Sequence, residues 1–251
     1  MKLNIRAQTA QNQHNNSPIV LVHGLFGSLD NLGVLARDLV NDHNIIQVDM
    51  RNHGLSPRDP VMNYPAMAQD LVDTLDAQQI DKATFIGHSM GGKAVMALTA
   101  LARDHIDKLV AIDIAPVDYH VRRHDEIFAA INAVSESDAQ TRQQAAAIMR
   151  QHLNEEGVIQ FLLKSFVDGE WRLTCQYCGI SIRILWVGRK SRHGIILPCL
   201  SLAAILVCCE QYRDDLLAQF PQARAHVIAG AGHWVHAEKP DGITRYPSLS
   251  Q

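Results

Sequence analysis

Short runs of consecutive apolar residues alternate along the chain with longer segments in which apolar residues recur every three or four positions. The run at 18–24 (PIVLVHG) is apolar at successive positions, which is typical of a strand buried on both faces of a parallel sheet, and similar runs follow at 44–50, 82–89 and 108–116. Between these runs, helical spacing is found at 32–42, 64–80 and 91–104. Because strands that alternate with helices imply right-handed crossovers, the pattern predicts an α/β domain with a mostly parallel sheet flanked by helices.

From about Val117 to Trp171 the pattern is helical throughout, with no strand-like run between its helical segments. So many helical residues in succession exceed a single crossover, which favours a helical lid inserted over the carboxyl edge of the sheet, where ligands bind. The alternative is a set of ordinary crossover helices. The lid interpretation divides the chain into a first core part at 1–117, a lid at 118–190 and a last core part at 191–251.

Length and charge narrow the function classes. The chain has 251 residues and a mass of 27.9 kDa, enough for one large domain with a sizeable core. Its formal net charge of −3 provides no basic field, so we expect a small-molecule partner, and neither nucleic acid nor a membrane. The polar first 18 residues lack the apolar core of a secretory signal, which favours a cytoplasmic location. The pattern does not indicate an oligomeric state.

The segment at 85–95 (FIGHSMGGKAV) places Ser89 between two glycines, after an apolar run and before a helical one. This is the G-x-S-x-G pattern, in which a sharp turn from strand to helix projects the serine oxygen from the sheet edge. We expect Gly87 and Gly91 to be small so that they do not clash with the serine. The N–H of Met90, at the start of the helix, is the expected donor to an oxyanion. The alternative is a tight structural turn.

Thirteen histidines compete to be the base that a serine nucleophile needs. His233 is favoured because it follows a strand-like run in a glycine-lined loop late in the chain, and His236 is the alternative. The loop after the first clear strand, HGLFGS at 23–28, is expected to complete the oxyanion hole. Its candidate donor is the N–H of Leu25, with Phe26 as a helper, whereas His23 is expected to be structural.

Four segments in this order, LVHGLFGS, VDMRNHGLS, FIGHSMGG and GAGHWVHAEKP, resemble the α/β-hydrolase superfamily. The resemblance covers residues 1 to about 172 and 210 to 240. It implies the α/β-hydrolase fold, with Ser89 as nucleophile, His233 as base, and Leu25 and Met90 as oxyanion donors. It also implies that Asp49 and Arg51, in a turn that braces the sheet edge, are structural.

The third member of the predicted triad is the acid that orients the histidine. In most of the superfamily it follows the penultimate strand, but the stretch 173–209 contains no Asp or Glu. Asp113 ends the strand next to that of the serine, and a carboxylate there can reach the same imidazole, so we favour it as the acid. The alternatives are Glu210, Asp214 and Asp118, or an acid missing from this chain, and a buried Asp113 that only binds backbone also remains open.

The stretch 173–209 differs in composition from both its flanks and carries all five cysteines of the chain. A zinc site is disfavoured because the pair in CQYC has only the adjacent Cys208 and Cys209 as a poor second pair. A membrane span is disfavoured because the apolar run 194–209 is short and contains proline. We interpret 173–209 as translated out of frame, with a divergent segment as the alternative, and extend the suspicion to the final residues 241–251, where Pro247 prevents a long closing helix.

Together these features predict a serine hydrolase that cleaves carboxylic esters or thioesters through an acyl-enzyme, without cofactor or metal. Phe26, Arg122 and Arg123 are expected to contact substrate, and the two arginines would suit an anionic leaving group such as a phosphorylated thiol carrier. The alternative for the arginines is a solvated helix start. The alternative for the whole chain is a catalytically disabled or non-catalytic relative that binds a small molecule.

Overall fold

The computed structural model describes residues 1–12, 16–117, 125–174, 201–206, 212–230, 232–233 and 235–244. Arg122, Arg123, Asp118, Glu210 and the five cysteines lie outside the described residues, and so do the predictions made for them. Within the described ranges, no helix is both long and apolar enough to cross a membrane.

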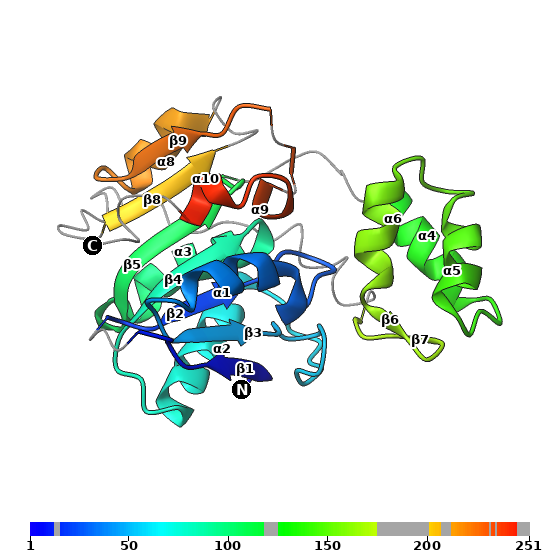
Figure 1. Ribbon diagram of the computed structural model, residues 1–251, viewed down its shortest axis with the longest axis horizontal. Helices are drawn as coiled ribbons and strands as arrows, with labels where there is room; N and C mark the ends of the chain where they lie inside the picture. The colour runs from blue at the N-terminus through cyan, green and yellow to red at the C-terminus, as the bar shows by residue number, and fades with distance from the viewer. Residues whose placement is uncertain are drawn as a thin grey trace.

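A seven-stranded sheet forms the centre of the larger part of the molecule (Figure 1). Its strand order is β1-β3-β2-β4-β5-β8-β9, and every neighbouring pair is parallel except β1 with β3. The strands span β1 Ile5–Gln8, β2 Ile19–Val22, β3 Ile45–Val48, β4 Ala83–His88, β5 Ile106–Ile112, β8 Ser201–Leu206 and β9 Arg224–Val227. The predicted α/β architecture with a mostly parallel sheet is confirmed.

Helices cover both faces of the sheet. One face packs against α2 (Tyr64–Ala77), α3 (Met90–Leu101) and α8 (Arg213–Gln219). The other face packs against α1 (Gly33–Leu39), α9 (Val235–Glu238) and α10 (Asp241–Thr244). Two 3-10 turns, η1 (Leu29–Leu32) and η2 (Arg103–His105), precede α1 and β5.

The central strands are apolar at every position because both faces are covered. In β2, Val20 and Val22 belong to the core on the side of α2 and α3, while Ile19 and Leu21 belong to the core on the side of α1. All four side chains are at most 1% exposed. This two-sided burial explains why these strands lack the alternation of polar and apolar residues that a half-exposed strand has.

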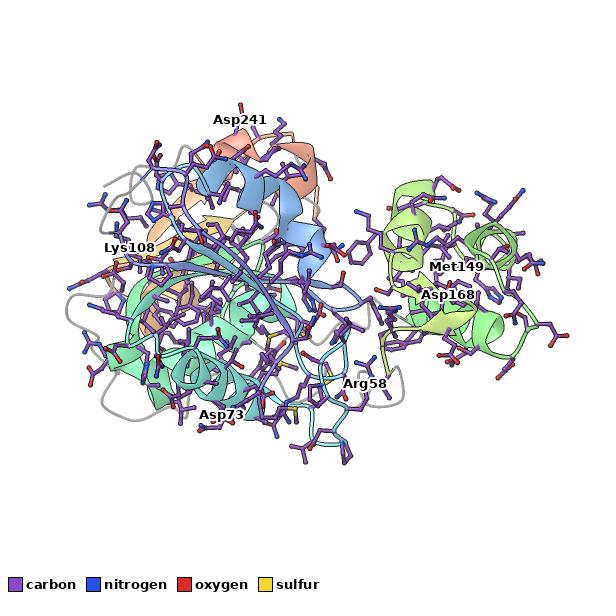
Figure 2. The ribbon with its side chains drawn as sticks, turned by 60° about the horizontal axis from the view of Figure 1, so that its bottom comes forward. Arg58, Asp73, Lys108, Met149, Asp168 and Asp241 are labelled. Atoms are coloured by element: carbon purple, nitrogen blue, oxygen red, sulfur yellow. The ribbon has the colours of Figure 1, made fainter. Side chains whose placement is uncertain are left out.

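A separate helical unit lies beside the sheet, built from α4 (Asp125–Ser135), α5 (Arg142–Met149) and α6 (Glu156–Leu163) (Figure 1). Figure 2 shows this unit from another side, with Met149 and Asp168 labelled in it. The three helices were predicted, but a two-stranded hairpin, β6 (Phe166–Val167) and β7 (Glu170–Trp171), follows them instead of more helix. Its turn is Asp168-Gly169 with positive φ at both residues, the geometry that favours a tight hairpin.

Two further strands differ from the prediction. β1 was missed because its sequence, IRAQ, alternates apolar and polar residues over only four positions at the sheet edge, where it is partly exposed. β8 lies inside 173–209, the stretch interpreted as out of frame, yet it pairs in parallel with both β5 and β9. Its run SLAAIL is short and continuous, a pattern that suits a central strand as well as a piece of helix. Most of 173–209 lies outside the described residues, so the out-of-frame interpretation stays a prediction.

Candidate active site

Ser89 occupies a strained turn between β4 and α3. Its φ of 51° and ψ of −115° lie far from the regions that non-glycine residues favour. The surrounding backbone holds it there, because the Ser89 N–H donates to the Ile112 carbonyl at 2.9 Å and the Lys93 N–H donates to the Ser89 carbonyl at 3.1 Å. Strain of this kind persists only when neighbouring structure over-determines it, and it is concentrated at functional sites.

The glycines around Ser89 allow a close approach of backbones. A Cβ atom at Gly91 would lie 2.3 Å from the Val22 carbonyl oxygen in β2, and one at Gly87 would lie 2.5 Å from the Gly91 carbonyl. The expected reason for these glycines, a clash with the serine itself, is therefore wrong in its detail. They are needed because the first turn of α3 packs directly against β2 and against its own preceding strand.

Asp113 and His233 are joined by a short hydrogen bond between their side chains. The Nδ1 atom of His233 lies 2.5 Å from Oδ2 of Asp113, which follows β5 directly. The Asp113 side chain is 2% exposed and that of His233 is 40% exposed, so a buried carboxylate holds a histidine that solvent can reach. Asp113 also has a positive φ of 50°, a conformation that Asp adopts more easily than most residues and that marks a second strained position.

His88, directly before the serine, contacts the loop of His233. Its Nε2–H donates to the His233 carbonyl oxygen at 2.8 Å, and the two rings lie 4.9 Å apart between centroids at an angle of 48°. The His88 side chain is almost fully buried. His88 at the end of β4 therefore contacts both the backbone and the ring of His233, and Asp113 directly after β5 contacts the ring.

Two buried histidines support the loop that follows β2. His53 Nε2 accepts the Phe26 N–H at 3.2 Å, and His23 Nε2 accepts the Met50 N–H at 3.0 Å. Each ring therefore carries its proton on Nδ1, which donates to the Arg51 carbonyl in His53 and to the Gly24 carbonyl in His23. Burial lowers the pKa of His23 and lowers the pKa of His53 to about 3, so both rings are neutral near pH 7.

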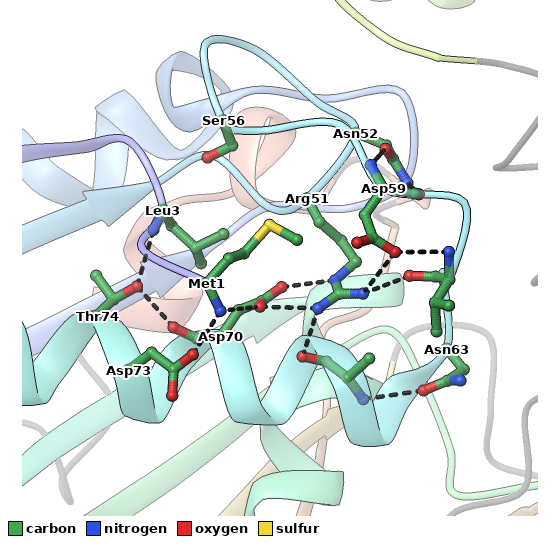
Figure 3. A network of polar contacts seen from close by, with 12 residues as sticks. Met1, Leu3, Arg51, Asn52, Ser56, Asp59, Asn63, Asp70, Asp73 and Thr74 are labelled. Carbon is green, nitrogen blue, oxygen red and sulfur yellow. Dashed lines mark hydrogen bonds and ion pairs between the residues drawn. The ribbon is translucent and has the colours of Figure 1, made fainter.

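The turn at 49–56 binds the segment that follows this loop through hydrogen bonds. The Asp49 carboxylate accepts the N–H groups of Leu29 at 2.8 Å and Leu55 at 3.0 Å. Arg51 makes a two-pronged contact with the buried Asp70, with Nε at 2.6 Å and Nη2 at 2.8 Å from the carboxylate oxygens. Figure 3 shows this pair at the centre of a network that continues to the Met1 amino group. Asp49 and Arg51 are structural, as predicted.

Comparison with known proteins places the chain in a family. Residues 17–154, more than half of the chain, match the family described as alpha/beta hydrolase fold. The chain belongs to the α/β-hydrolase family. Esterase YbfF of Escherichia coli (strain K12) is 83% identical to it, over 98% of this chain and 97% of that protein. The sn-1-specific diacylglycerol lipase ABHD11 of Mus musculus is 34% identical, over 91% of this chain and 80% of the lipase. Among solved structures, a marine microorganism esterase superposes with a TM-score of 0.87 at 30% identity, covering 97% of both chains.

Phe26 differs from its predicted part in this α/β-hydrolase site. Its N–H is taken by His53 and its carbonyl accepts the Ser165 hydroxyl at 2.9 Å, so it is not a helper donor to an oxyanion. Its ring is only 3% exposed and packs edge-on against Phe128 of α4 with centroids 5.2 Å apart. Phe26, with a φ of 63°, therefore joins the loop after β2 to the helical unit. A direct contact of Phe26 with substrate stays a prediction.

Of the other predicted site residues, some lie at the site and Asp214 lies on α8. The structure brings Asp113 to His233, and it places Ser89 and Met90 at the turn from β4 into α3. Asp214, an alternative acid, is exposed in the first turn of α8. Sequence reasoning missed His88 and His53 as contributors. Their signal was position, since one adjoins the nucleophile candidate and the other lies in the second of the quoted motifs.

Proposed function

We propose that this α/β-hydrolase cleaves carboxylic esters, including thioesters, by acyl transfer to Ser89. The observation that carries the proposal is the strained Ser89 at the start of α3, whose N–H binds the carbonyl of Ile112 directly before the buried Asp113 that contacts His233. The relatives named esterase and lipase support ester hydrolysis as the reaction. A small-molecule ester or thioester is the proposed substrate.

In the proposed reaction His233 takes the proton of the Ser89 hydroxyl as the oxygen attacks the ester carbonyl. Asp113 keeps the ring in the tautomer with its proton on Nδ1 and stabilises the imidazolium that forms. The tetrahedral oxyanion accepts hydrogen bonds from the N–H groups of Leu25 and Met90. Met90 suits this role because the first N–H groups of a helix have no carbonyl one turn before them.

The second half of the reaction releases the acyl group. His233 gives its proton to the leaving alcohol or thiol as the tetrahedral intermediate collapses, and the acyl group stays on Ser89. A water molecule then transfers a proton to His233 and attacks the acyl carbonyl. As the second intermediate collapses to a carboxylic acid, His233 returns this proton to the leaving Ser89 oxygen. These steps use only groups of the chain and water.

We propose further that the unit of α4 to α6 with the β6–β7 hairpin is the lid of this site. Support comes from its contact with the loop that carries Leu25: Phe128 packs on Phe26, and the Ser165 hydroxyl donates to the Phe26 carbonyl. Leu25 itself packs partly against the apolar core of the helical unit. A lid in this position would shape the acyl pocket, so Phe128→Ala should change the relative kcat/KM for short and long acyl esters.

Hydrolysis of p-nitrophenyl butyrate by the purified chain tests the proposal. We expect turnover that falls to the buffer rate in Ser89→Ala. The matched control is Ser135→Ala, at an exposed serine at the end of α4, which should keep the full rate. Turnover that survives in Ser89→Ala, or a folded wild-type chain without turnover, would contradict the proposal and favour a non-catalytic binder.

A further inference from the structure

His88 lies between Ser89, the loop of His233 and the loop after β2. It is the last residue of β4, adjoins Ser89 in the chain, and is almost fully buried. Because its Nε2 faces a carbonyl oxygen, that nitrogen must carry the ring proton and donate it to His233. The hydrogen bond of 2.8 Å joins residues that are 145 positions apart in the chain.

The opposite side of the His88 ring packs against the loop after β2. A Cβ atom placed at Gly24 would lie 2.8 Å from His88 Nδ1 and 3.3 Å from Ser89 Cβ. The Gly24 backbone is therefore in tight contact with both residues, and any larger residue there would displace the ring. Gly24 directly precedes Leu25, the proposed oxyanion donor.

His233 lies in the loop between β9 and α9, which we call the base loop, and Val235 of α9 anchors the far end of this loop in the core. The strand before it, β9, is the edge of the sheet and is largely exposed, and the N–H of Gly232 donates to the Glu238 side chain of α9 at 2.7 Å. Two contacts described above tie His233 itself to the inner strands: its ring to Asp113 and its carbonyl to His88. The Asp113 contact is made to the His233 ring, while the His88 hydrogen bond is made to the loop backbone.

We propose that His88 is a positioning residue that holds the base loop and the loop of Gly24 and Leu25 at their working distances from Ser89. The inference rests on the proposed function, since the distances matter only if Ser89 and His233 react together. His88 does not touch the reacting atoms in this account. It acts through His233 and Gly24, and a displacement of about 1 Å in such an arrangement can cost on the order of 100-fold in rate.

Three substitutions at His88 distinguish the loss of its hydrogen bond to His233 from the loss of side-chain packing. His88→Gln keeps an N–H donor at the position of Nε2, His88→Met has a similar length without a donor, and His88→Asn has a donor that is too short to reach the His233 carbonyl. We expect His88→Met and His88→Asn to lower kcat for p-nitrophenyl butyrate roughly 30- to 100-fold with KM within about 2-fold. His88→Gln should regain at least about 10-fold of this loss, because it restores the donor.

Thermal unfolding and an unrelated histidine complete the experiment. His152→Gln, at an exposed position between α5 and α6, should leave kcat unchanged. Equal kcat in the Gln, Met and Asn variants, or losses that follow their unfolding temperatures instead of the presence of the donor, would overturn the proposal. If His88→Met does not fold, the comparison of Gln with Asn decides alone. A folded wild-type chain without Ser89-dependent turnover would instead overturn the proposed function, and this inference with it.

Discussion

Ser89 and His233 lie in parts of the molecule that are held in place by different means. The turn at Ser89 is enclosed by β2, β4 and the buried end of β5, and by backbone contacts so close that Gly91 has no room for a side chain. The loop of His233 follows an exposed edge strand and is anchored by the buried Val235 of α9, and His233 itself contacts Asp113 and His88.

The difference separates two ways of building a reactive geometry. The conformation of Ser89 is maintained by backbone hydrogen bonds and steric exclusion among the strands and the helix that adjoin it. The position of His233 depends on side chains from distant segments, so single substitutions far along the chain can move it. We therefore expect changes near Ser89 to act on stability as well as rate, and changes at the contacts of His233 to act mainly on rate.

The largest expected effect is on the base itself. His233→Gln should lower kcat by more than about 10⁴-fold, since the serine then lacks a proton acceptor. The matched control is His236→Gln, three residues later, which should keep most of the activity. Kinetics with p-nitrophenyl butyrate check this, and the reverse outcome for the two variants would move the base to His236.

The next largest effect is expected at the acid. Asp113→Asn preserves shape and tolerates the positive φ, but it favours the wrong tautomer of His233, so kcat should fall by about 10³-fold or more. The unfolding temperature should change little. Asp214→Asn on the exposed first turn of α8 serves as control. Loss of activity in Asp214→Asn with little change in Asp113→Asn would assign the acid to α8.

A stability effect is expected at the glycine of the turn. Gly91→Ala would place a methyl group 2.3 Å from the Val22 carbonyl and should lower the free energy of unfolding by about 3 kcal/mol. Gly157, in α6, has no atom within 4 Å of the same added group, so Gly157→Ala should be neutral or stabilise by up to about 1 kcal/mol. Urea unfolding of both variants measures the contrast, and equal stabilities would refute the steric account.

The last expected effect is a pH dependence of stability, which is small at pH 7 and grows as the pH falls. Burial lowers the pKa of His53 to about 3 and also lowers that of His23, whereas an unfolded histidine titrates near 6.5. As pH falls below about 6.5 the unfolded chain gains protons that the folded chain does not, so the free energy of unfolding decreases by about 1.4 kcal/mol per pH unit for each such histidine. For His53 the decrease ends near pH 3, where the folded protein takes up the proton.

Urea unfolding of the wild type and of His53→Gln between pH 7 and pH 4.5 measures this contribution. The variant should lose less stability with falling pH, and the two slopes should differ by about 1.4 kcal/mol per pH unit below pH 6. Parallel curves would mean that His53 titrates alike in the folded and unfolded chains. That result would remove the argument that a neutral His53 accepts the Phe26 N–H in the loop after β2.

The sequence predicts the elements that leave a periodic hydrophobic pattern or a short local motif. The apolar runs of β2 to β5 and the helical spacing of α1 to α6 identify most of the fold, because burial on both faces leaves a direct pattern. The turn at Ser89 is likewise visible, since its glycines and flanking elements adjoin it. β1 escapes because four alternating residues at a sheet edge carry little signal, and the β6–β7 hairpin because its strands have only two residues each.

Contacts between distant segments are the part that sequence could not supply. Asp113 was chosen among several acids only because it ends the strand beside that of Ser89. Nothing in the pattern indicates that His53 would take the Phe26 N–H, or that His88 would reach the loop of His233. These interactions depend on how loops cross over the sheet edge, which hydrophobic periodicity does not encode.

Mapping the reaction site of a fluorophosphonate probe tests the central claim most directly. Trypsin should release residues 83–93, ATFIGHSMGGK, as one peptide that contains Ser89. The account predicts a single adduct on that peptide in the wild-type chain, no adduct in Ser89→Ala, and slower labelling in Asp113→Asn. A folded wild-type chain that takes up no probe, or one labelled on another peptide, would contradict it.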